Sequence, residues 1–265
     1  MGVCGCVDLT GQVAVISGGL GDIGRAIALA LAACGADVAL GDVLDGSEAT
    51  SLLGEIAALK RRARYDRVDV ADAAAVAAWI EAVEGDLGDI TLVVPNAAVV
   101  HEGGVREVSD AEWRSQLSAN LDGAFHLARC CSLRMLRHGR GGRMVFIGSW
   151  AGRVPHPGIL AYCVSKAGVS MLCRCMAADL ARDGILVNEV APGYVDAGLS
   201  GRLFKEDPGR REKARQSVPV GELIAPEEVA RQVVWLCDPL NRQVVGQALT
   251  MDGGLSLFGP GGQRR

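Results

Sequence analysis

Long apolar runs and metal-ligand spacings are both absent from this sequence. Its longest apolar stretches are interrupted by Gly, Asp or Arg, so no segment reaches the length of a membrane span. The nine cysteines include no Cys-x-x-Cys pair and the four histidines are scattered, which leaves no spacing typical of a metal site. An odd number of cysteines in a chain of this length favours reduced thiols and a cytoplasmic location over a disulfide framework. We therefore predict a protein with no membrane segment and no bound metal.

The sequence also lacks an excess of positive charge, with 27 Lys and Arg against 31 Asp and Glu. A net charge of −4 and a pI of about 5.6 argue against nucleic acid as a partner. With 265 residues, 49% hydrophobic, the chain suits a single large α/β domain, which we assign to residues 8–258 between a flexible lead-in (1–7) and a flexible tail (259–265). No internal repeat or interdomain linker interrupts it. The first residues lack the apolar region of a signal peptide, and Cys6 stands where an acylation pattern requires Ser or Thr.

Short apolar runs alternate along the chain with Ala- and Leu-rich segments of helical length. This alternation predicts a Rossmann-like, doubly wound parallel sheet of about seven strands with helices on both faces. We expect strands at residues 12–16, 37–41, 65–68, 90–94, 144–147, 185–188 and 247–251. We expect helices at residues 25–34, 47–61, 72–83, 110–137, 161–182 and 226–237. The basic segment 194–217 is interpreted equally well as a lid over a site or as a charged surface loop.

A glycine-rich turn follows the first predicted strand. Within residues 17–24, the pattern Gly19-x-Gly21-x-x-Gly24 matches the dinucleotide-binding fingerprint between a strand and a helix. Glycines let the backbone approach a pyrophosphate, and the helix N-terminus supplies N–H donors and a partial positive charge. This context favours a bound nucleotide over a plain tight turn.

An acidic residue closes the second predicted strand. Asp42 lies eighteen positions after Gly24, close to the ~20 expected for a carboxylate that bonds the ribose hydroxyls of adenosine. That carboxylate would repel a 2′-phosphate, and residues 41–44 hold no Arg or Lys to attract one. NAD is therefore favoured over NADP as the cofactor, unless Asp42 only caps the next helix. Asp69 could likewise bond the adenine amino group or cap a helix.

Tyr162 and Lys166 are four positions apart in a predicted helix and so share one face. A free tyrosine titrates near ~10, and a neighbouring ammonium favours the phenolate, as a general acid/base acting on an alcohol or ketone oxygen requires. Ser149 follows a predicted strand and could bind the same oxygen. Asn120 lies in a helix interior, where Asn usually faces solvent or has a specific role. Taken alone, the Tyr-x-x-x-Lys pattern is more simply an ordinary surface pair.

Together these motifs resemble the short-chain dehydrogenase/reductase family over about residues 8–258. The resemblance rests on Asp8-Leu-Thr-Gly11, the turn at 17–24, Asp69-Val70, Asn96-Ala97, Asn120, Ser149, Tyr162-x-x-x-Lys166, Asn188, Pro192-Gly193 and Asp252-Gly-Gly254. It implies a catalytic tetrad in which Tyr162 exchanges a proton with the substrate and Ser149 holds the substrate oxygen. Lys166 would lower the pKa of Tyr162 and bond the nicotinamide ribose, and Asn120 would hold a water that links Lys166 to solvent.

The resemblance also implies a cofactor site. Its residues would be Ser17, Gly18, Gly19, Leu20, Asp22, Ile23, Asp42, Val43, Asp69, Val70, Asn96, Ala97, Ala98, Tyr162, Lys166, Pro192, Gly193 and Val195. Substrate candidates flank the tetrad: Val100, Trp150, His156, Tyr194 and Leu199. For His156, a structural role is the simpler interpretation.

Four positions depart from the family pattern. Asp22 replaces the middle glycine of the turn, where its carboxylate could cap the helix. Pro95 removes a backbone donor at the end of a strand, and Ala98 requires an ordinary φ where the family has glycine. Ala197 stands where a threonine commonly bonds the carboxamide, so that contact would rest more on the backbone near Val195.

The function predicted from the sequence is NAD-dependent interconversion of a secondary alcohol and its ketone, with a polyol, sugar or cyclic alcohol as substrate. One alternative is a 3-ketoacyl-thioester reductase of the same family using NADPH, because the basic residues 202–215 could meet an acidic carrier. A second alternative is a nucleotide-binding protein without catalysis, which an intact tetrad disfavours. The resemblance further implies a homodimer or homotetramer that pairs helices 110–137 and 161–182, although Leu172 and Met176 could equally belong to the core.

Overall fold

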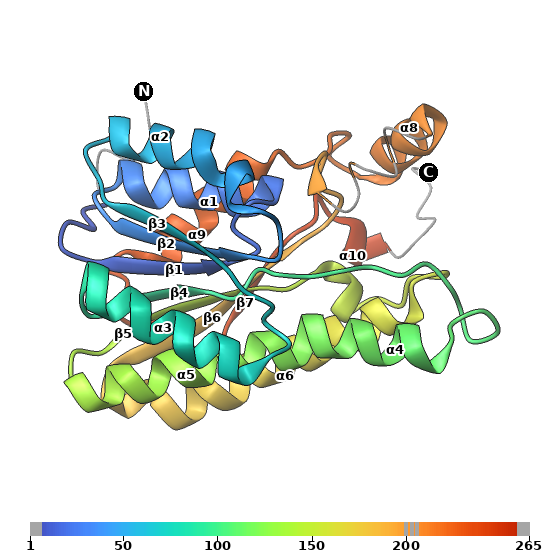
Figure 1. The fold of residues 1–265 in the computed structure, drawn as a ribbon. Coiled ribbons are helices and arrows are strands. Elements are labelled where there is room, and N and C mark those ends of the chain that lie inside the picture. The colour runs from blue at the N-terminus through green and yellow to red at the C-terminus, as the bar shows by residue number, and fades with distance from the viewer. Residues whose placement is uncertain (1–6, 199–200, 202–203, 205–206, 259–265) are drawn as a thin grey trace.

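The computed structural model describes residues 7–198, 201, 204 and 207–258. In these residues seven strands form one parallel sheet in the order β3-β2-β1-β4-β5-β6-β7 (Figure 1). The strands are β1 (Val13–Ser17), β2 (Asp37–Asp42), β3 (Ala63–Arg67), β4 (Leu92–Val94), β5 (Gly142–Ile147), β6 (Ile185–Pro192) and β7 (Ala248–Met251). The predicted Rossmann-like sheet is confirmed.

Helices cover both faces of the sheet. On one face pack α1 (Asp22–Ala33), α2 (Thr50–Ala58) and α9 (Pro226–Cys237), and on the other α3 (Ala73–Leu87), α5 (Gly123–His138) and α6 (Leu160–Leu180). The shorter helices are α4 (Asp110–Leu117), α8 (Pro208–Ser217) and α10 (Leu255–Phe258). Because both faces are covered, β1 is buried at all five positions and β6 at all eight, which explains the apolar runs at residues 13–16 and 185–187 within them. Each fully buried Ile or Leu contributes roughly 1.5–3 kcal/mol to folding.

The strand order reverses beside β1, which lies between β2 and β4. In a parallel sheet all carboxyl ends meet at one edge, and ligands of such folds bind at the point of reversal. Ser17, Asp42, Asn96 and Ser149 lie at or just beyond the ends of β1, β2, β4 and β5. The fold therefore gathers residues from four separate segments along one edge.

Several predicted boundaries were wrong. The first helix begins at Asp22, three residues before the predicted start, and the predicted helix 47–61 is a short 3-10 helix, η2 (Gly46–Ala49), followed by α2. Asp45 causes this break, because its carboxylate accepts from the Ser47 N–H and starts the tighter turn. A short helix that was not predicted, α10, ends the described chain just before the predicted tail 259–265, and its first turn is capped by Asp252 through the Ser256 N–H.

The predicted helix 110–137 is interrupted. It consists of α4 and α5 joined by a π-helical turn, η3 (Ser118–Asp122), with Asn120 at its centre. Single π turns often mark functional sites. The segment 194–217, interpreted as a lid or a surface loop, contains α8. The substrate candidate Leu199, in the same segment, lies outside the described residues.

Candidate active site

The predicted catalytic residues come together at the carboxyl edge of the sheet. Ser149 precedes the 3-10 helix η4 (Trp150–Gly152), and its hydroxyl accepts from the Ala151 N–H at 3.2 Å. Tyr162 and Lys166 lie in the first two turns of α6, with Lys166 Nζ 5.7 Å from the centre of the Tyr162 ring. Lys166 is 2% exposed and donates to the Ile147 carbonyl at 2.8 Å, at the end of β5. Lys166 is therefore buried and Tyr162 is partly buried, so the Tyr-x-x-x-Lys pair is not an exposed surface pair.

Burial sets the electrostatics of this pair. Burial raises the pKa of Tyr162 to about 12, opposed by its hydrogen bond with Ser149. Burial lowers the pKa of Lys166 to about 8, opposed by the negative charge of Glu189. The protein alone thus holds a neutral phenol, and further positive charge at the site would favour the phenolate.

The side chain of Asn120 is fully engaged with its neighbours. Its Oδ1 accepts from the Val99 N–H at 2.7 Å, and its Nδ2 donates to the Val99 carbonyl at 2.9 Å and to Ser165 Oγ at 3.0 Å. The π turn places this side chain toward the loop after β4, and Asn120 is 1% exposed. Asn120 therefore joins α6 to that loop, and its predicted link to a water remains a prediction.

The glycine turn has the shape that a dinucleotide site requires. A Cβ on Gly24 would lie 2.1 Å from the Gly18 carbonyl oxygen, so only glycine allows this close approach. The first residues of α1 have no side-chain cap, which leaves N–H donors at the helix N-terminus for an anion. Leu20 N–H donates to Asp42 Oδ2 at 3.1 Å, so the turn and the end of β2 are directly connected. These residues fit a dinucleotide cofactor.

The end of β4 is bonded to the same turn. Ser17 Oγ accepts from the N–H groups of Asn96 and Ala97, at 3.0 and 3.2 Å. Asn96 Nδ2 donates to the carbonyls of Ser17 and Gly18, both at 3.0 Å. Ala98 is not among the residues with positive φ, as its side chain requires. Despite the departures at Pro95 and Ala98, the loop is held against the glycine turn.

The adenosine end of the predicted site contains one residue that the sequence reasoning missed. Asp42 Oδ1 accepts from the Val43 N–H at 2.8 Å, while the next helical turn is capped by Asp45, so Asp42 is not a helix cap. Its register partner on β3 is Arg67, whose Nε donates to the Val43 carbonyl at 2.9 Å. A cation therefore lies beside the Asp42 segment although residues 41–44 contain none. Only the pairing register of β2 and β3 could have revealed it.

Asp69 and Asp22 make contacts that the sequence left open. Asp69 Oδ1 accepts from the Ala71 N–H at 2.9 Å, and Asp72, not Asp69, caps α3. Asp22 does not cap α1. Its Oδ2 accepts from the Gly198 N–H at 2.7 Å and joins the glycine turn to the start of the lid segment.

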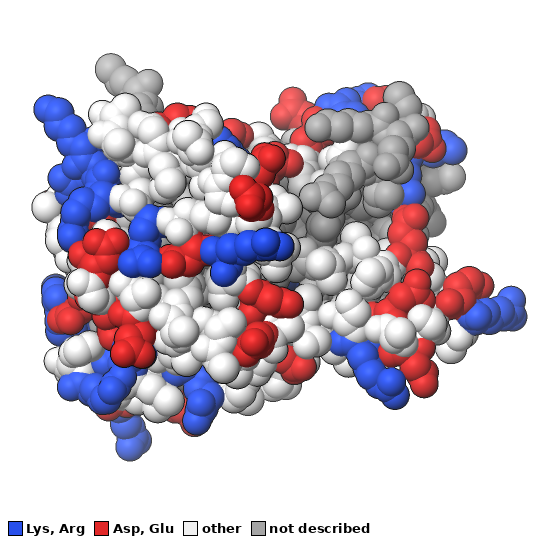
Figure 2. All heavy atoms as spheres, viewed as in Figure 1, with Lys and Arg blue, Asp and Glu red and all other residues white. Residues whose placement is uncertain are grey.

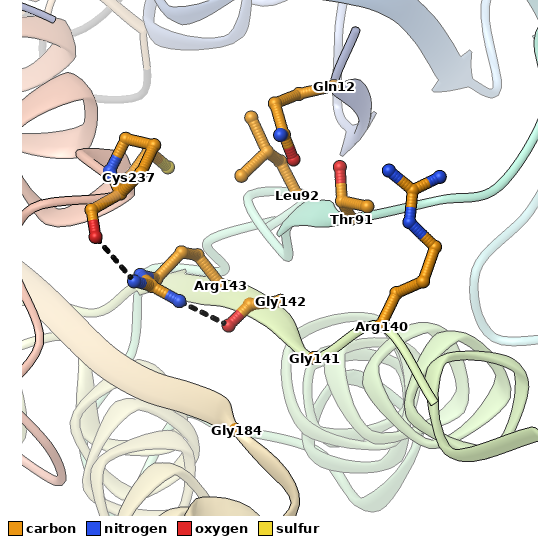
Figure 3. Close-up of a pocket in the computed structure, with 10 residues that line it drawn as sticks. Gln12, Thr91, Leu92, Arg140, Gly141, Gly142, Arg143, Gly184 and Cys237 are labelled. Atoms are coloured by element: carbon orange, nitrogen blue, oxygen red, sulfur yellow. Dashed lines mark hydrogen bonds between the residues drawn. The ribbon is translucent and has the colours of Figure 1, made fainter. Parts of the chain in front are cut away.

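A cavity of about 700 Å³ lies between the glycine turn and the lid segment. Leu20, Asp22, Asp196, Gly198 and Phe204 are among the residues that line it. A second cavity, of about 200 Å³, lies at the opposite, amino-terminal edge of the sheet between Arg140 and Arg143 (Figure 3). There the Arg143 guanidinium donates to the Gly142 carbonyl at 3.1 Å. None of the predicted site residues lines this second cavity, whereas the first is lined by Leu20 and Asp22 of the glycine turn and by none of the predicted catalytic residues.

Three of the predicted substrate residues form one aromatic cluster. The Trp150 ring, 3% exposed, makes edge contacts with His156 at 5.8 Å and with Tyr194 at 5.5 Å. His156 Nδ1 lies 2.9 Å from the Pro157 carbonyl, which only accepts, so Nδ1 carries the proton in the neutral ring. The Tyr194 hydroxyl then donates to Nε2 at 3.0 Å, which leaves its oxygen able to accept a further hydrogen bond. Val100 lies at the end of the loop that Asn120 holds.

Ion pairs join α8 to both sides of this region. Arg210 pairs with Glu102 at 2.6 Å and Arg211 pairs with Asp196, whereas the pair of Arg215 and Glu212, at 2.6 Å, lies within α8. Phe204 contacts Tyr194, with ring centres 6.5 Å apart. Val195 pairs with Ile224 in an isolated β-bridge, which holds the backbone just after β6. Phe204 of the segment 194–217 therefore contacts Tyr194 of the aromatic cluster, and the role of this segment as a lid remains a prediction.

The strand order, the glycine turn and the residues at the carboxyl edge define a Rossmann-like protein with a nicotinamide-type dinucleotide site. A family model described as enoyl-(acyl carrier protein) reductase matches residues 13–256. The chain belongs to the short-chain dehydrogenase/reductase family and is an oxidoreductase of that family, which binds a nicotinamide cofactor. No helix among the described residues is long and apolar enough to cross a membrane.

Similar proteins differ in the substrate that their names give. The chain is 35% identical to cis-4-hydroxycyclohexanecarboxylate dehydrogenase of Sinomonas cyclohexanicum, over 92% of this chain and 96% of the relative. It is 32% identical to 3-oxoacyl-acyl-carrier-protein reductase of Haemophilus influenzae, over 94% of this chain and all of the relative. A solved structure from Beutenbergia cavernae, assigned as an NAD(P)-dependent gluconate 5-dehydrogenase with bound NADP, is 33% identical with a TM-score of 0.87, covering 93% and 97% of the two chains.

Proposed function

We propose that this protein is an NAD(H)-dependent dehydrogenase that interconverts a secondary alcohol and its ketone. The observation that carries the proposal is the pair of the partly buried Tyr162 and the buried Lys166, set beside Ser149 at the carboxyl edge of the sheet. A phenol beside a buried ammonium is suited to proton exchange with an alcohol oxygen. Burying the Lys166 amine costs free energy, and an exposed lysine would avoid that cost.

In the proposed mechanism Ser149 Oγ holds the substrate oxygen, and Tyr162 takes its proton in oxidation or returns it in reduction. Lys166 stabilises the phenolate by its charge and is placed to exchange the Ile147 carbonyl for a ribose hydroxyl. When bound, NAD(H) supplies hydride exchange at the substrate carbon. Trp150 shields one side of the site from water and keeps the local dielectric low.

The preference for NAD rests on Asp42. Its carboxylate is held at the end of β2 by the N–H groups of Leu20 and Val43, so it cannot turn away without losing both bonds. A fixed carboxylate bonds ribose hydroxyls and repels a 2′-phosphate. Arg67, next to Asp42 in register, gives NADP a competing attraction, and one similar structure holds NADP.

The substrate we propose is a polyol, sugar or cyclic alcohol. The cluster of Trp150, His156 and Tyr194 offers an apolar ring face with a hydrogen-bond acceptor at one end, which suits a compact hydroxylated molecule. The similarity to a hydroxycyclohexanecarboxylate dehydrogenase supports this class.

The alternative is a 3-ketoacyl-thioester reductase using NADPH, supported by the Haemophilus influenzae relative. That activity calls for a basic surface to receive an acidic carrier. The described arginines of α8 are instead paired with Glu102, Asp196 and Glu212. On the face seen in Figure 2, basic and acidic side chains are interspersed. We therefore place this alternative second, and a non-catalytic nucleotide-binding role third.

We further propose a cytoplasmic homo-oligomer that pairs α5 and α6. Exposed apolar side chains on these helices support the pairing: Phe125, Leu133, Leu136, Val164 and Met171. Leu172 and Met176 pack against the core of the same chain, so they contribute less to it than the sequence suggested.

The proposal is tested with a panel of secondary alcohols and ketones, followed by NADH absorbance. Tyr162→Phe is expected to lower kcat by about 10²–10⁴-fold, because the proton exchange is lost. The far-UV circular dichroism spectrum and the urea midpoint should stay unchanged and serve as the control for folding. Full turnover of the variant on any substrate found would refute the mechanism.

Cofactor choice is tested separately by comparing NADH and NADPH binding in the wild type and in Asp42→Ala. We expect the wild type to prefer NADH and the variant to lose that preference by about tenfold, the effect of roughly one charge–phosphate contact. A wild-type preference for NADPH would contradict the role given to Asp42.

A further inference from the structure

A buried carboxyl group lies directly behind the catalytic edge. Glu189 is on β6, 1% exposed, between Phe146 of β5 and Ala248 of β7. A Cβ on Gly148 would lie 1.8 Å from Glu189 Oε1, so the carboxyl group packs against the backbone just before Ser149. An ionisable group in such a place is costly unless it has a partner or a role.

The nearest polar partner of Glu189 is on the helix that carries the catalytic pair. Ser170 Oγ lies 2.7 Å from Glu189 Oε1 and 2.6 Å from Oε2. Ser170 is one turn after Lys166 and shares its face of α6. Among the described residues Glu189 has no cation within 4.0 Å, so no direct ion pair neutralises its charge there.

Three cations and one thiol face this carboxyl group. Two of the cations, Lys166 and Arg174, come from α6, and the third, Arg153, comes from the end of η4. Burial raises the pKa of Glu189, and all three cations oppose that rise. Burial raises the pKa of the Cys173 thiol to about 12, which keeps it neutral. Of the three cations, Lys166 is the most deeply buried at 2% exposed. Arg153 has the largest charge interaction with Glu189 and Lys166 the next. Lys166 is the one held in the interior, because its Nζ bonds the Ile147 carbonyl, one residue before the Gly148 backbone against which Glu189 packs. Screening by water is weakest there.

We propose that Glu189 is an electrostatic positioning residue, whose buried carboxylate holds Lys166 in the ammonium form. The inference rests on the proposed function, in which that ammonium stabilises the Tyr162 phenolate. Burial alone drives Lys166 toward the neutral amine, and Glu189 supplies the opposing charge. Without it, less of the protein would carry the charge that the proton exchange needs.

The test measures Lys166 directly, without cofactor or substrate. The chain has only four lysines, Lys60, Lys166, Lys205 and Lys213, so a ¹³C-lysine NMR titration is simple, with Lys166→Arg for assignment. In Glu189→Gln, which keeps the side-chain size and its contact with Ser170, the pKa of Lys166 should fall by about one unit. That is a tenfold shift toward the amine. The other lysines should be unchanged, and an unchanged or raised pKa of Lys166 would overturn the proposal.

A second variant keeps the test decisive if Glu189→Gln does not fold. Ser170→Ala removes a donor that favours the carboxylate, so it should lower the pKa of Lys166 in the same direction by a smaller amount. No shift in this variant would also count against the proposal.

Measurement of activity then distinguishes failure of the proposed function from failure of the proposed role of Glu189. In Glu189→Gln the alkaline limb of the kcat profile for ketone reduction should move to lower pH along with the pKa of Lys166. If the wild type shows no dehydrogenase activity, the proposed function fails whatever the titration gives. If the wild type is active and neither the titration nor the profile moves, only the role of Glu189 is refuted.

Discussion

Replacing Asn120 by alanine should destabilise the fold by about 2 kcal/mol, because one buried and two part-buried hydrogen bonds are lost together. The Val99 N–H, which donates to Oδ1 at 2.7 Å, would be left without a partner, and an orphaned donor costs about 1–3 kcal/mol. The two acceptors that Asn120 Nδ2 bonds each keep another hydrogen bond. The Val99 carbonyl still accepts from Gln116 Nε2 at 3.2 Å, and Ser165 Oγ still donates to the Tyr162 carbonyl at 2.8 Å.

Urea unfolding followed by circular dichroism measures this loss. Asn241→Ala is the matched control, since its exposed amide makes a single bond of 3.4 Å to Trp235 and should cost less than about 0.5 kcal/mol. We also expect a lower kcat in Asn120→Ala, because Asn120 joins the loop after β4 to the catalytic helix. A loss of stability no larger than that of the control would show that Asn120 does not hold the loop in this way.

Two further predictions concern the site. The pKa of Lys166 is lowered from 10.5 to about 8 in the folded protein, so between these pH values the unfolded chain binds more protons. The free energy of unfolding of the wild type, relative to Lys166→Met, should therefore increase as pH rises through this window, by up to about 1.4 kcal/mol per pH unit. Urea unfolding at several pH values measures it, and the opposite slope would exclude the lowered pKa. Tyr194→Phe removes the hydroxyl bonded to His156 and should raise KM for hydroxylated substrates about tenfold at unchanged kcat. An equal fall in kcat would instead assign Tyr194 to the chemical step.

The sheet could be predicted from the sequence because its strands are covered on both faces. Burial on both sides requires continuous apolar runs such as residues 13–16 and 185–187, and the alternation with helices then implies parallel strands. The π turn at Asn120 could not be predicted in this way. It depends on hydrogen bonds to Val99, which is 21 residues away, and such a contact exists only once the chain has folded.

The candidate site likewise contains residues that the sequence could predict and residues that only the fold reveals. The spacing of Asp42 from the glycine turn follows from the length of one helix, and the contact of its carboxylate with the Leu20 N–H agrees with that spacing. Arg67 lies beside Asp42 only because β2 and β3 pair in one register, and a shift of one residue would move it to the other face. Asp22 was interpreted as a helix cap from local position, whereas its partner, Gly198, comes from the far end of the chain.

Glu189 escaped the sequence reasoning because it stands between Asn188 and Val190 in a buried strand, where a carboxylate has no local explanation. Its place depends on two residues that come before it in the chain. Gly148 leaves room for the carboxyl group and Ser170 bonds it. A side chain on Gly148 would overlap Glu189 Oε1 at 1.8 Å, so either the carboxyl group or the end of β5 would have to move. The position of Ser149, one residue further, is therefore coupled to the same carboxylate that we propose acts on Lys166, and a change at any of these positions should disturb both catalytic partners of Tyr162.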